Sequence, residues 1–241
     1  MAERLLKKMA KSAVYVRRLE QFVRDVTLYP VSCERLANGR SDREWLEAVL
    51  AGGVRIVQLR DKDSSDRVLL EKARYFRKMT EDAGALFLVN DRLDIALLAD
   101  ADGIHVGQKD LPAEEIRRLA PDMLIGVSCN SEEQAAQLGR LERLGRLAAS
   151  YFNIGPLYPT TTKEGLSSFI GLDAIALFSS RCSLPFTVMG GIKLEHVAEL
   201  VAAGARRIAV VTAITQAADM QEETGRWLAS IRRAVEEVEH G

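Results

Sequence analysis

The chain has 241 residues, 47% of them apolar, and a formal net charge of -1. This composition is normal for a globular protein, and the balanced charge argues against nucleic acid or an anionic membrane as a partner. No apolar run approaches the roughly 20 residues that span a bilayer. Cys33, Cys129 and Cys182 are too few for a disulfide framework and fit no metal motif. We therefore expect a soluble cytoplasmic protein, and these properties are compatible with a homo-oligomer.

Residues 1–25 predict an amphipathic helix. Apolar residues recur at roughly helical spacing between Leu5 and Phe22, and the segment leans basic. A transit peptide is the alternative, but the acidic residues of the segment are untypical of one. We expect a helical extension that closes one end of a single domain over residues 26–241.

Eight short β-rich runs alternate with eight helical patterns from residue 26 onward. The runs are near-continuously apolar, as is typical of parallel strands covered on both faces. No linker divides them, so they predict one α/β domain, a (β/α)8 TIM barrel, with a doubly wound open sheet as the alternative. The expected strands are 26–31, 54–59, 86–89, 103–106, 124–127, 151–154, 186–189 and 207–211. The expected helices are 42–51, 66–83, 92–99, 113–119, 131–138, 172–179, 194–203 and 220–238, with N-caps at Ser41, Ser65 and Ser131.

A cationic pair follows the second expected strand. Alternation along the chain places Gln58, Arg60 and Lys62 on one side. The active site of such a barrel lies at the carboxyl ends of the strands, where two cations and an amide suit a phosphate or pyrophosphate. The alternative is an exposed strand end whose charge is neutralised by Asp61 and Asp63.

Carboxylates follow the third and fourth expected strands. Asn90 and Asp91 follow one, and Asp110 follows the other. These residues could simply cap the next helices, which is their commoner use. If Asp91 and Asp110 instead face one cavity, a Mg²⁺ ion that bridges them to phosphate oxygens explains the pair. His105 lies within its strand between apolar neighbours, so we expect an interior position for it at least as much as acid–base chemistry.

Hydroxyl groups follow the fifth and sixth expected strands. Ser128 could donate to a substrate oxygen, and no His–Asp arrangement is visible around it, so we expect no serine nucleophile. After the sixth strand, Thr160, Thr162 and Lys163 make a loop that suits an anion, although a solvated turn has a similar composition.

A second anion site is expected over the last two strands. Gly191 lies in a Gly-Gly pair that lets backbone N–H groups approach an oxyanion, and Val211 and Thr212 follow the eighth strand. The loops after strands seven and eight are the recurrent phosphate site of this fold. The sequence therefore predicts two anionic groups in one pocket.

Six segments together resemble a known family. They are Gln58-Leu-Arg60-Asp-Lys62, Asn90-Asp91-Arg92, residues 101–110, Gly126-Val-Ser128, residues 155–163 and Gly190-Gly-Ile. The resemblance is to thiamine phosphate synthase and covers roughly residues 28–219. It implies a TIM-barrel transferase that joins 4-amino-2-methyl-5-hydroxymethylpyrimidine diphosphate to a thiazole phosphate and releases thiamine phosphate and pyrophosphate.

The resemblance also implies roles for individual residues. Mg²⁺ is the implied cofactor, bound by Asp91 and Asp110. The implied substrate contacts are Arg60, Lys62, Asn90 and Lys163 with the diphosphate, Gln58 and Ser128 with the pyrimidine and its leaving group, Thr160 and Thr162 with the thiazole, and Gly191, Val211 and Thr212 with its phosphate. The implied catalytic residues are Arg60, Lys62, Ser128 and Lys163.

Two other functions remain as alternatives. A thiazole tautomerase-like relative needs a histidine in the loop after the fifth strand, where this chain has Asn130. A phosphate-binding barrel without activity would not need both aspartates and the threonine-rich loop. The pair Cys129-Asn130 departs from the pattern of the synthases and leaves the fine substrate contacts in question.

Overall fold

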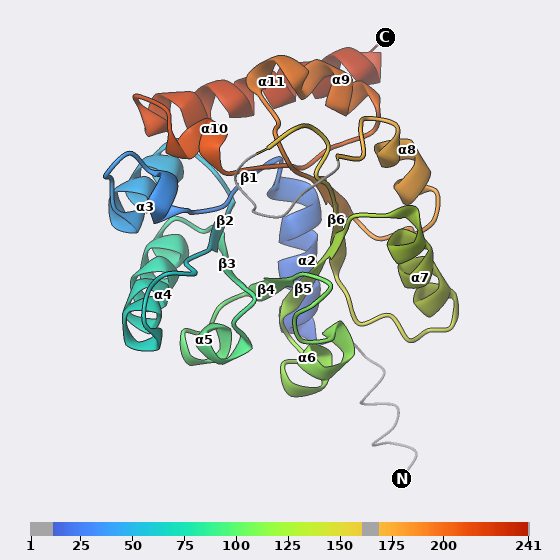
Figure 1. Cartoon of the computed structure of the whole chain (residues 1–241), viewed down its shortest axis with the longest axis horizontal. Helices are drawn as coiled ribbons and strands as arrows, with labels where there is room; N and C mark the ends of the chain where they lie inside the picture. Colours follow the sequence, from blue (N-terminus) through green and yellow to red (C-terminus); the bar gives the residue numbers. More distant parts are fainter. Residues whose placement is uncertain (1–11, 161–168, 241) are drawn as a thin grey trace.

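The computed structural model describes residues 12–160 and 169–240, which form a parallel barrel inside a ring of helices (Figure 1). The strands are β1 (Leu28–Pro30), β2 (Ile56–Leu59), β3 (Leu86–Asn90), β4 (Gly103–Val106), β5 (Leu124–Cys129), β6 (Tyr151–Ile154), β7 (Phe186–Val188) and β8 (Ile208–Val210). Their order in the sheet is β1-β8-β7-β6-β5-β4-β3-β2. A parallel bridge between Val31 and Gln58 joins the two end strands. The barrel is therefore nearly closed, which confirms the predicted fold and excludes the open sheet.

Helices alternate with the strands and cover the outside of the barrel (Figure 1). They are α2 (Ala13–Asp25), η1 (Glu34–Leu36), α3 (Asp42–Ala51), α4 (Asp66–Asp82), α5 (Leu93–Leu98), α6 (Ala113–Leu119), α7 (Glu132–Arg143), α8 (Ala174–Ser179), η2 (Leu194–His196), α9 (Val197–Ala202), α10 (Thr212–Thr215) and α11 (Met220–His240). Ser41 and Ser131 cap α3 and α7 as predicted. Ser65 precedes α4 but makes no capping hydrogen bond with its side chain. Among the described helices, none is long and apolar enough to cross a membrane.

The structure corrects several predicted bounds. Strand β5 extends to Cys129 because its last residues pair with β6. Helix α7 continues through Gly139, where a Cβ atom would lie 1.8 Å from the carbonyl oxygen of Arg181. That glycine permits close packing against the chain after α8 and does not end its helix. The expected helix over 194–203 divides into η2 and α9, and α10 was not expected. The other bounds agree within two residues.

Helix α2 lies across the amino-terminal ends of the strands, at the centre of the ring in Figure 1. Its partners stand just before strands: Arg18 donates to the Asp102 carboxylate (2.9 Å), and Arg207 donates to the Phe22 carbonyl oxygen (3.0 Å). The Phe22 ring lies 4.5 Å from the ring of Tyr151 inside the barrel. The predicted helix that closes one end is confirmed over Ala13–Asp25, and residues 1–11 of the prediction lie outside the described residues. The division of the chain at residue 25 stays a prediction.

Two hydrophobic cores result from this arrangement. The larger one lies between the strands and the outer helices. The smaller one fills the inside of the barrel with alternate strand residues and the apolar face of α2, namely Tyr15, Phe22, Val26, Tyr29, Val31, Ile56, Leu86, Leu88, Leu124, Tyr151 and Ala209. In the described part of the chain, this core and α2 therefore close the amino-terminal end of the barrel.

Candidate active site

Arg60 and Lys62 line one cavity of about 470 Å³ above β1 and β2. The Arg60 N–H donates to Ser32 Oγ (3.1 Å), and its guanidinium lies 3.7 Å from Cys33 Sγ. The predicted convergence of the two cations is therefore present. Gln58 differs, because it is buried inside the barrel and donates from Nε2 to Tyr29 Oη (2.8 Å).

Asp91 and Asp110 lie beside this cationic end of the barrel. Lys62 Nζ is 3.2 Å from the Asp91 carboxylate, and the Asp110 carboxylate accepts from the Gly107 N–H (2.7 Å). Burial raises the pKa of Asp91, and the charge of Asp110 raises it further while Lys62 opposes both effects. We call Asp91 and Asp110 the open acidic pair. Asn90 ends β3 in register with His105, which places it next to the pair.

The backbone at Asp91 is also unusual. Its φ angle is 61°, in the left-handed region that a non-glycine residue seldom adopts, and such strain is concentrated at functional sites. The capping alternative is not observed, because the N-cap residues of α5 and α6 are Arg92 and Pro112. The half-buried carboxylate of Asp91 and the exposed carboxylate of Asp110 repel each other, and such a pair fits a hard divalent cation, which prefers oxygen ligands.

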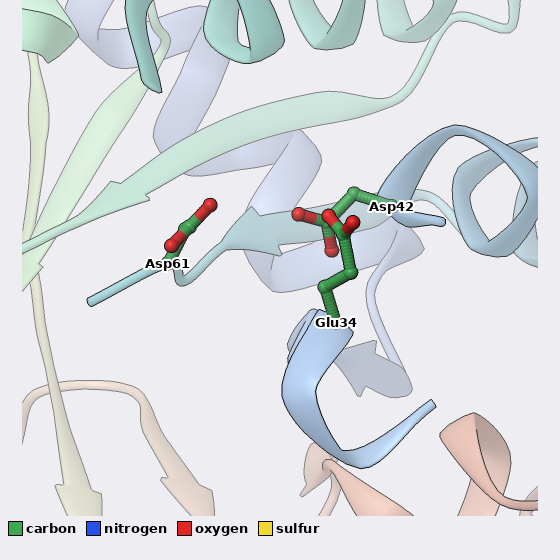
Figure 2. Close-up of side chains that lie close together, drawn as sticks. All are labelled: Glu34, Asp42 and Asp61. Atoms are coloured by element: carbon green, nitrogen blue, oxygen red, sulfur yellow. The ribbon is translucent and has the colours of Figure 1, made fainter. Parts of the chain in front are cut away.

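A second group of carboxylates lies nearby and has a different character. Figure 2 shows Glu34, Asp42 and Asp61, whose ligand atoms all lie within 4.8 Å of one another. Lys72 of α4 donates to all three, at 2.6 Å to Asp61 and 2.9 Å to Asp42. We call these four residues the Lys72 cluster. The Lys72 ammonium group already occupies the space between the carboxylates, so the cluster does not fit a metal ion. Its hydrogen bonds link η1, α3 and the loop after β2 to α4.

The Lys72 cluster also answers a question left by the sequence. In the alternative interpretation of this strand end, Asp61 and Asp63 neutralise Arg60 and Lys62. Instead, hydrogen bonds from Lys72 and Ser64 outweigh burial and hold the pKa of Asp61 well below its usual range. Asp63 is largely exposed and lies 3.9 Å from Arg35. Neither Asp61 nor Asp63 therefore neutralises Arg60 or Lys62.

Ser128 has a partner that the sequence did not reveal. Its Oγ lies 2.9 Å from His105 Nε2, and His105 Nδ1 lies 3.0 Å from the Tyr151 hydroxyl. His105 occupies the expected interior position. Because its second nitrogen faces a phenol and not a carboxylate, the group is not a Ser–His–Asp triad. Burial raises the pKa of Cys129 to about 12, so its thiol stays protonated.

The loops after β6 and β7 pack directly on each other. Gly190 and Gly191 have φ angles of 103° and 64°, and a Cβ at Gly191 would lie 2.3 Å from the Pro159 carbonyl oxygen. The Tyr158 N–H donates to the Gly190 carbonyl oxygen (3.0 Å). This packing brings Thr160, the residue after Pro159, close to Gly191. Thr162 and Lys163 lie outside the described residues.

The predicted phosphate residues after β8 stand at the start of α10. Val211 is its N-cap residue and Thr212 is its first residue. The first N–H groups of a helix have no partner within it, so they are available to an anion. The structure thus places Val211 and Thr212 at the carboxyl end of the barrel, as predicted.

Comparison with known proteins identifies the family. The thiamine monophosphate synthase family matches residues 28–214. A thiamine-phosphate synthase of Shouchella clausii is 40% identical over 208 residues, which are 86% of this chain and 97% of that protein. One from Chloroflexus aurantiacus is 41% identical over 196 residues, 81% of this chain and 88% of that protein.

The solved structures agree. A thiamine phosphate pyrophosphorylase from Pyrococcus furiosus superposes with a TM-score of 0.75 at 32% identity, over 89% of this chain and 97% of that one. A geranylgeranylglyceryl phosphate synthase from Thermoplasma acidophilum, at 12% identity and a TM-score of 0.63, covers 93% of this chain and 100% of its own and shares the fold alone. The chain therefore belongs to the thiamine monophosphate synthase family and is a transferase of thiamine biosynthesis.

Proposed function

We propose that this enzyme joins 4-amino-2-methyl-5-hydroxymethylpyrimidine diphosphate to 4-methyl-5-(2-phosphoethyl)thiazole, or to its carboxylated form, with Mg²⁺ as cofactor. The products are thiamine phosphate and pyrophosphate. The observation that carries the proposal is the open acidic pair beside Lys62 and Arg60, at the ends of three consecutive strands. We expect these two small molecules to be the partners of the enzyme. We expect its location to be the cytoplasm.

The leaving group is the centre of the chemistry. The thiazole nitrogen forms a bond to the pyrimidine methylene carbon, and the carbon–oxygen bond breaks as the diphosphate departs with the electron pair. The aminopyrimidine ring can support positive charge, so the substitution is dissociative and needs no protein nucleophile. The protein must then stabilise the departing charge and hold the two rings together.

The cations of the site act on the departing diphosphate. Arg60, Lys62 and Asn90 hold it, with Lys163 from the loop after β6. Asp91 and Asp110 would hold Mg²⁺, which would supply further positive charge for the departing diphosphate. Loss of one well-placed electrostatic group of this kind costs roughly 3–4 kcal/mol of transition-state stabilisation.

The remaining residues bind and orient the two substrates. Ser128 lies toward the pyrimidine. Gln58, the other predicted pyrimidine contact, is buried inside the barrel and bonded to Tyr29, so we do not assign it a direct contact. The thiazole is contacted by Thr160 and Thr162, and its phosphate lies against Gly191, Val211 and Thr212. The described part of the loop after β6 packs on the loop after β7, so Thr160 and Gly191 are held close to each other.

The first experiment is a discontinuous assay. Purified protein is mixed with the pyrimidine diphosphate and the thiazole phosphate, with and without Mg²⁺, and thiamine phosphate is measured after oxidation to a fluorescent thiochrome. We expect product only when both substrates and the metal are present. Folded protein that gives no product would contradict the proposal. Thiazole tautomerisation, and then phosphate binding alone, would be tested next.

A further inference from the structure

Five polar side chains form a continuous chain of hydrogen bonds through the inside of the barrel. At one end Gln58 donates from Nε2 to Tyr29 Oη over 2.8 Å. The hydroxyls of Tyr29 and Tyr151 lie 3.1 Å apart, and the Tyr151 hydroxyl lies 3.0 Å from His105 Nδ1. At the other end His105 Nε2 lies 2.9 Å from Ser128 Oγ. We call these residues the interior polar chain.

The interior polar chain is dry at one end and open at the other. Gln58, Tyr29 and Tyr151 are each at most 3% exposed, and the Phe22 ring of α2 packs against Tyr151. Burial raises the pKa of both phenols well above the usual range, so each keeps its proton. Ser128 is partly exposed at the carboxyl end of β5. The chain therefore leads from a sealed interior to the substrate side.

The backbone leaves room for this contact. Gly126 stands between His105 and Tyr151 in the strand register. A Cβ atom there would lie 2.3 Å from the Tyr151 hydroxyl and 2.5 Å from His105 Nδ1. Any larger residue at this position would displace one ring, so the hydrogen bond between His105 and Tyr151 depends on this glycine.

The orientation of the Gln58 amide sets the direction of the bonds. The Gln58 amide donates to Tyr29, so the hydroxyl proton of Tyr29 is directed to Tyr151, and that of Tyr151 to His105 Nδ1. His105 then carries its proton on Nε2 and donates it to Ser128 Oγ. In the opposite direction the Tyr29 proton would face the amide N–H₂ of Gln58. A buried donor that faces another donor is strongly unfavourable.

We propose that Tyr151 and Tyr29 are positioning residues for catalysis. They hold His105 as the tautomer protonated on Nε2, and His105 in turn occupies the acceptor of Ser128. The Ser128 hydroxyl proton is thereby directed at the substrate and its leaving group, where the transition state develops charge. This inference rests on the proposed function, in which Ser128 lies beside the pyrimidine and the diphosphate.

Tyr151→Phe tests the inference in kinetics. It removes one hydroxyl and keeps the ring that packs against Phe22. We expect kcat to fall about 10- to 100-fold, the usual effect of losing a group that orients a functional histidine, with an unchanged KM for the thiazole phosphate. Tyr29→Phe, one bond further away, should have a smaller effect. Tyr75→Phe, on the outer helix α4, is the matched control and should leave kcat unchanged.

A spectroscopic measurement separates positioning from a structural effect. The chain has three histidines, so ¹⁵N-histidine labelling gives three ring systems, and His105→Gln identifies the one of interest. In the substrate-free wild type we expect the proton of His105 on Nε2. In Tyr151→Phe we expect a mixture of the two tautomers, and in Tyr75→Phe no change. Circular dichroism and the melting temperature establish that each variant is folded.

The outcomes distinguish the two proposals. A wild-type histidine protonated on Nδ1, or a Tyr151→Phe protein with unchanged kcat and tautomer, would overturn the role of the tyrosines. A larger effect of Tyr29→Phe than of Tyr151→Phe would overturn it as well. If the tautomer shifts as expected but the wild type makes no thiamine phosphate, the positioning of His105 stands and the proposed function fails.

Discussion

Two groups of carboxylates with a lysine lie close to the end of β2, and they differ in where the lysine stands. In the Lys72 cluster the ammonium group lies between three carboxylates, and the Lys72 side chain is only 13% exposed. Beside the open acidic pair, the Lys62 side chain is 57% exposed and contacts Asp91 at its margin, over 3.2 Å. The first lysine is a fixed part of the fold. The second is free to turn toward a bound anion.

This difference shows what distinguishes a metal site from a structural ion cluster. The Lys72 cluster has more carboxylates, and its geometry alone satisfies the spacing of metal ligands. The positive charge that balances these carboxylates, however, is already supplied by Lys72. The open acidic pair keeps a repulsion that Lys62 relieves only in part, and a divalent cation would relieve it further. The arrangement of the cations, more than the number of acids, identifies the site.

The largest expected effect is the loss of activity on removing either member of the open acidic pair. Asp91→Asn or Asp110→Asn should lower kcat by about 100- to 1,000-fold at limiting Mg²⁺, the scale of one well-placed electrostatic group. The melting temperature should not fall, because the substitution also removes a repulsion. Thiochrome assays across a Mg²⁺ series measure the effect, and Asp82→Asn on the exposed face of α4 is the control. Normal turnover in either variant would remove that residue from the site.

The two lysines should give opposite results. Lys72→Met leaves the buried carboxylates of Asp42 and Asp61 without their partner. It should lower the free energy of unfolding by about 3 kcal/mol, a fall of about 6–12 °C in melting temperature. Its kcat at 25 °C should stay within about twofold of the wild type. Lys62→Met should lower kcat by about tenfold or more, with little change in melting temperature because an exposed ion pair contributes little.

Calorimetry and the same assay check this contrast, with Lys78→Met as a surface control. If Lys72→Met lost activity without losing stability, the Lys72 cluster would belong to the catalytic machinery and the comparison would fail.

The smallest expected effect is a pH-dependent change in stability. Burial raises the pKa of Asp42 to about 6 in the folded protein, although Lys72 opposes it. The unfolded chain has the ordinary value of about 3.9. The stability that this proton contributes is thus fully present at pH values below the pKa of the unfolded chain. It is lost as the pH rises through about 6, the pKa of Asp42 in the folded protein.

Asp42→Asn should therefore raise the melting temperature by a few degrees at pH 8 and leave it nearly unchanged at pH 4. Thermal unfolding at the two pH values measures the difference. Destabilisation at pH 8 would show that Lys72 outweighs burial.

The sequence was sufficient for the barrel because its information is local. Eight apolar runs and their intervening helices set the fold, and the structure moves most bounds by no more than two residues. Other differences involve contacts between distant segments. Helix α7 runs past its predicted end through Gly139, where the missing side chain allows close packing against Arg181, and β5 is longer than predicted because its last residues pair with β6. A pattern along one chain segment carries no information about such partners.

The site was predictable to the same degree. Alternation and strand-end position correctly brought Arg60 and Lys62 to one cavity. What could not be read was the neutralisation of Asp61 by Lys72, since a lysine within an amphipathic helix has the same appearance whether it is solvated or buried. The sequence predicts only that Tyr151 belongs to an apolar strand. The hydrogen-bond partners of its hydroxyl come from other strands, so local spacing does not reveal them. Nothing in local spacing distinguishes a phenol that packs from one that also donates.

The position of α2 has a consequence for the order of folding. The helix emerges from the ribosome before any strand of the barrel, yet Arg207, which donates to the Phe22 carbonyl oxygen, lies 185 residues after Phe22 in the chain. At about 5–20 residues per second, synthesis of that interval takes roughly 10–40 s. During this time the apolar face of α2 has no finished barrel to cover. The helix that closes the barrel is made before the strands that it covers and is the last element to find its complete binding surface.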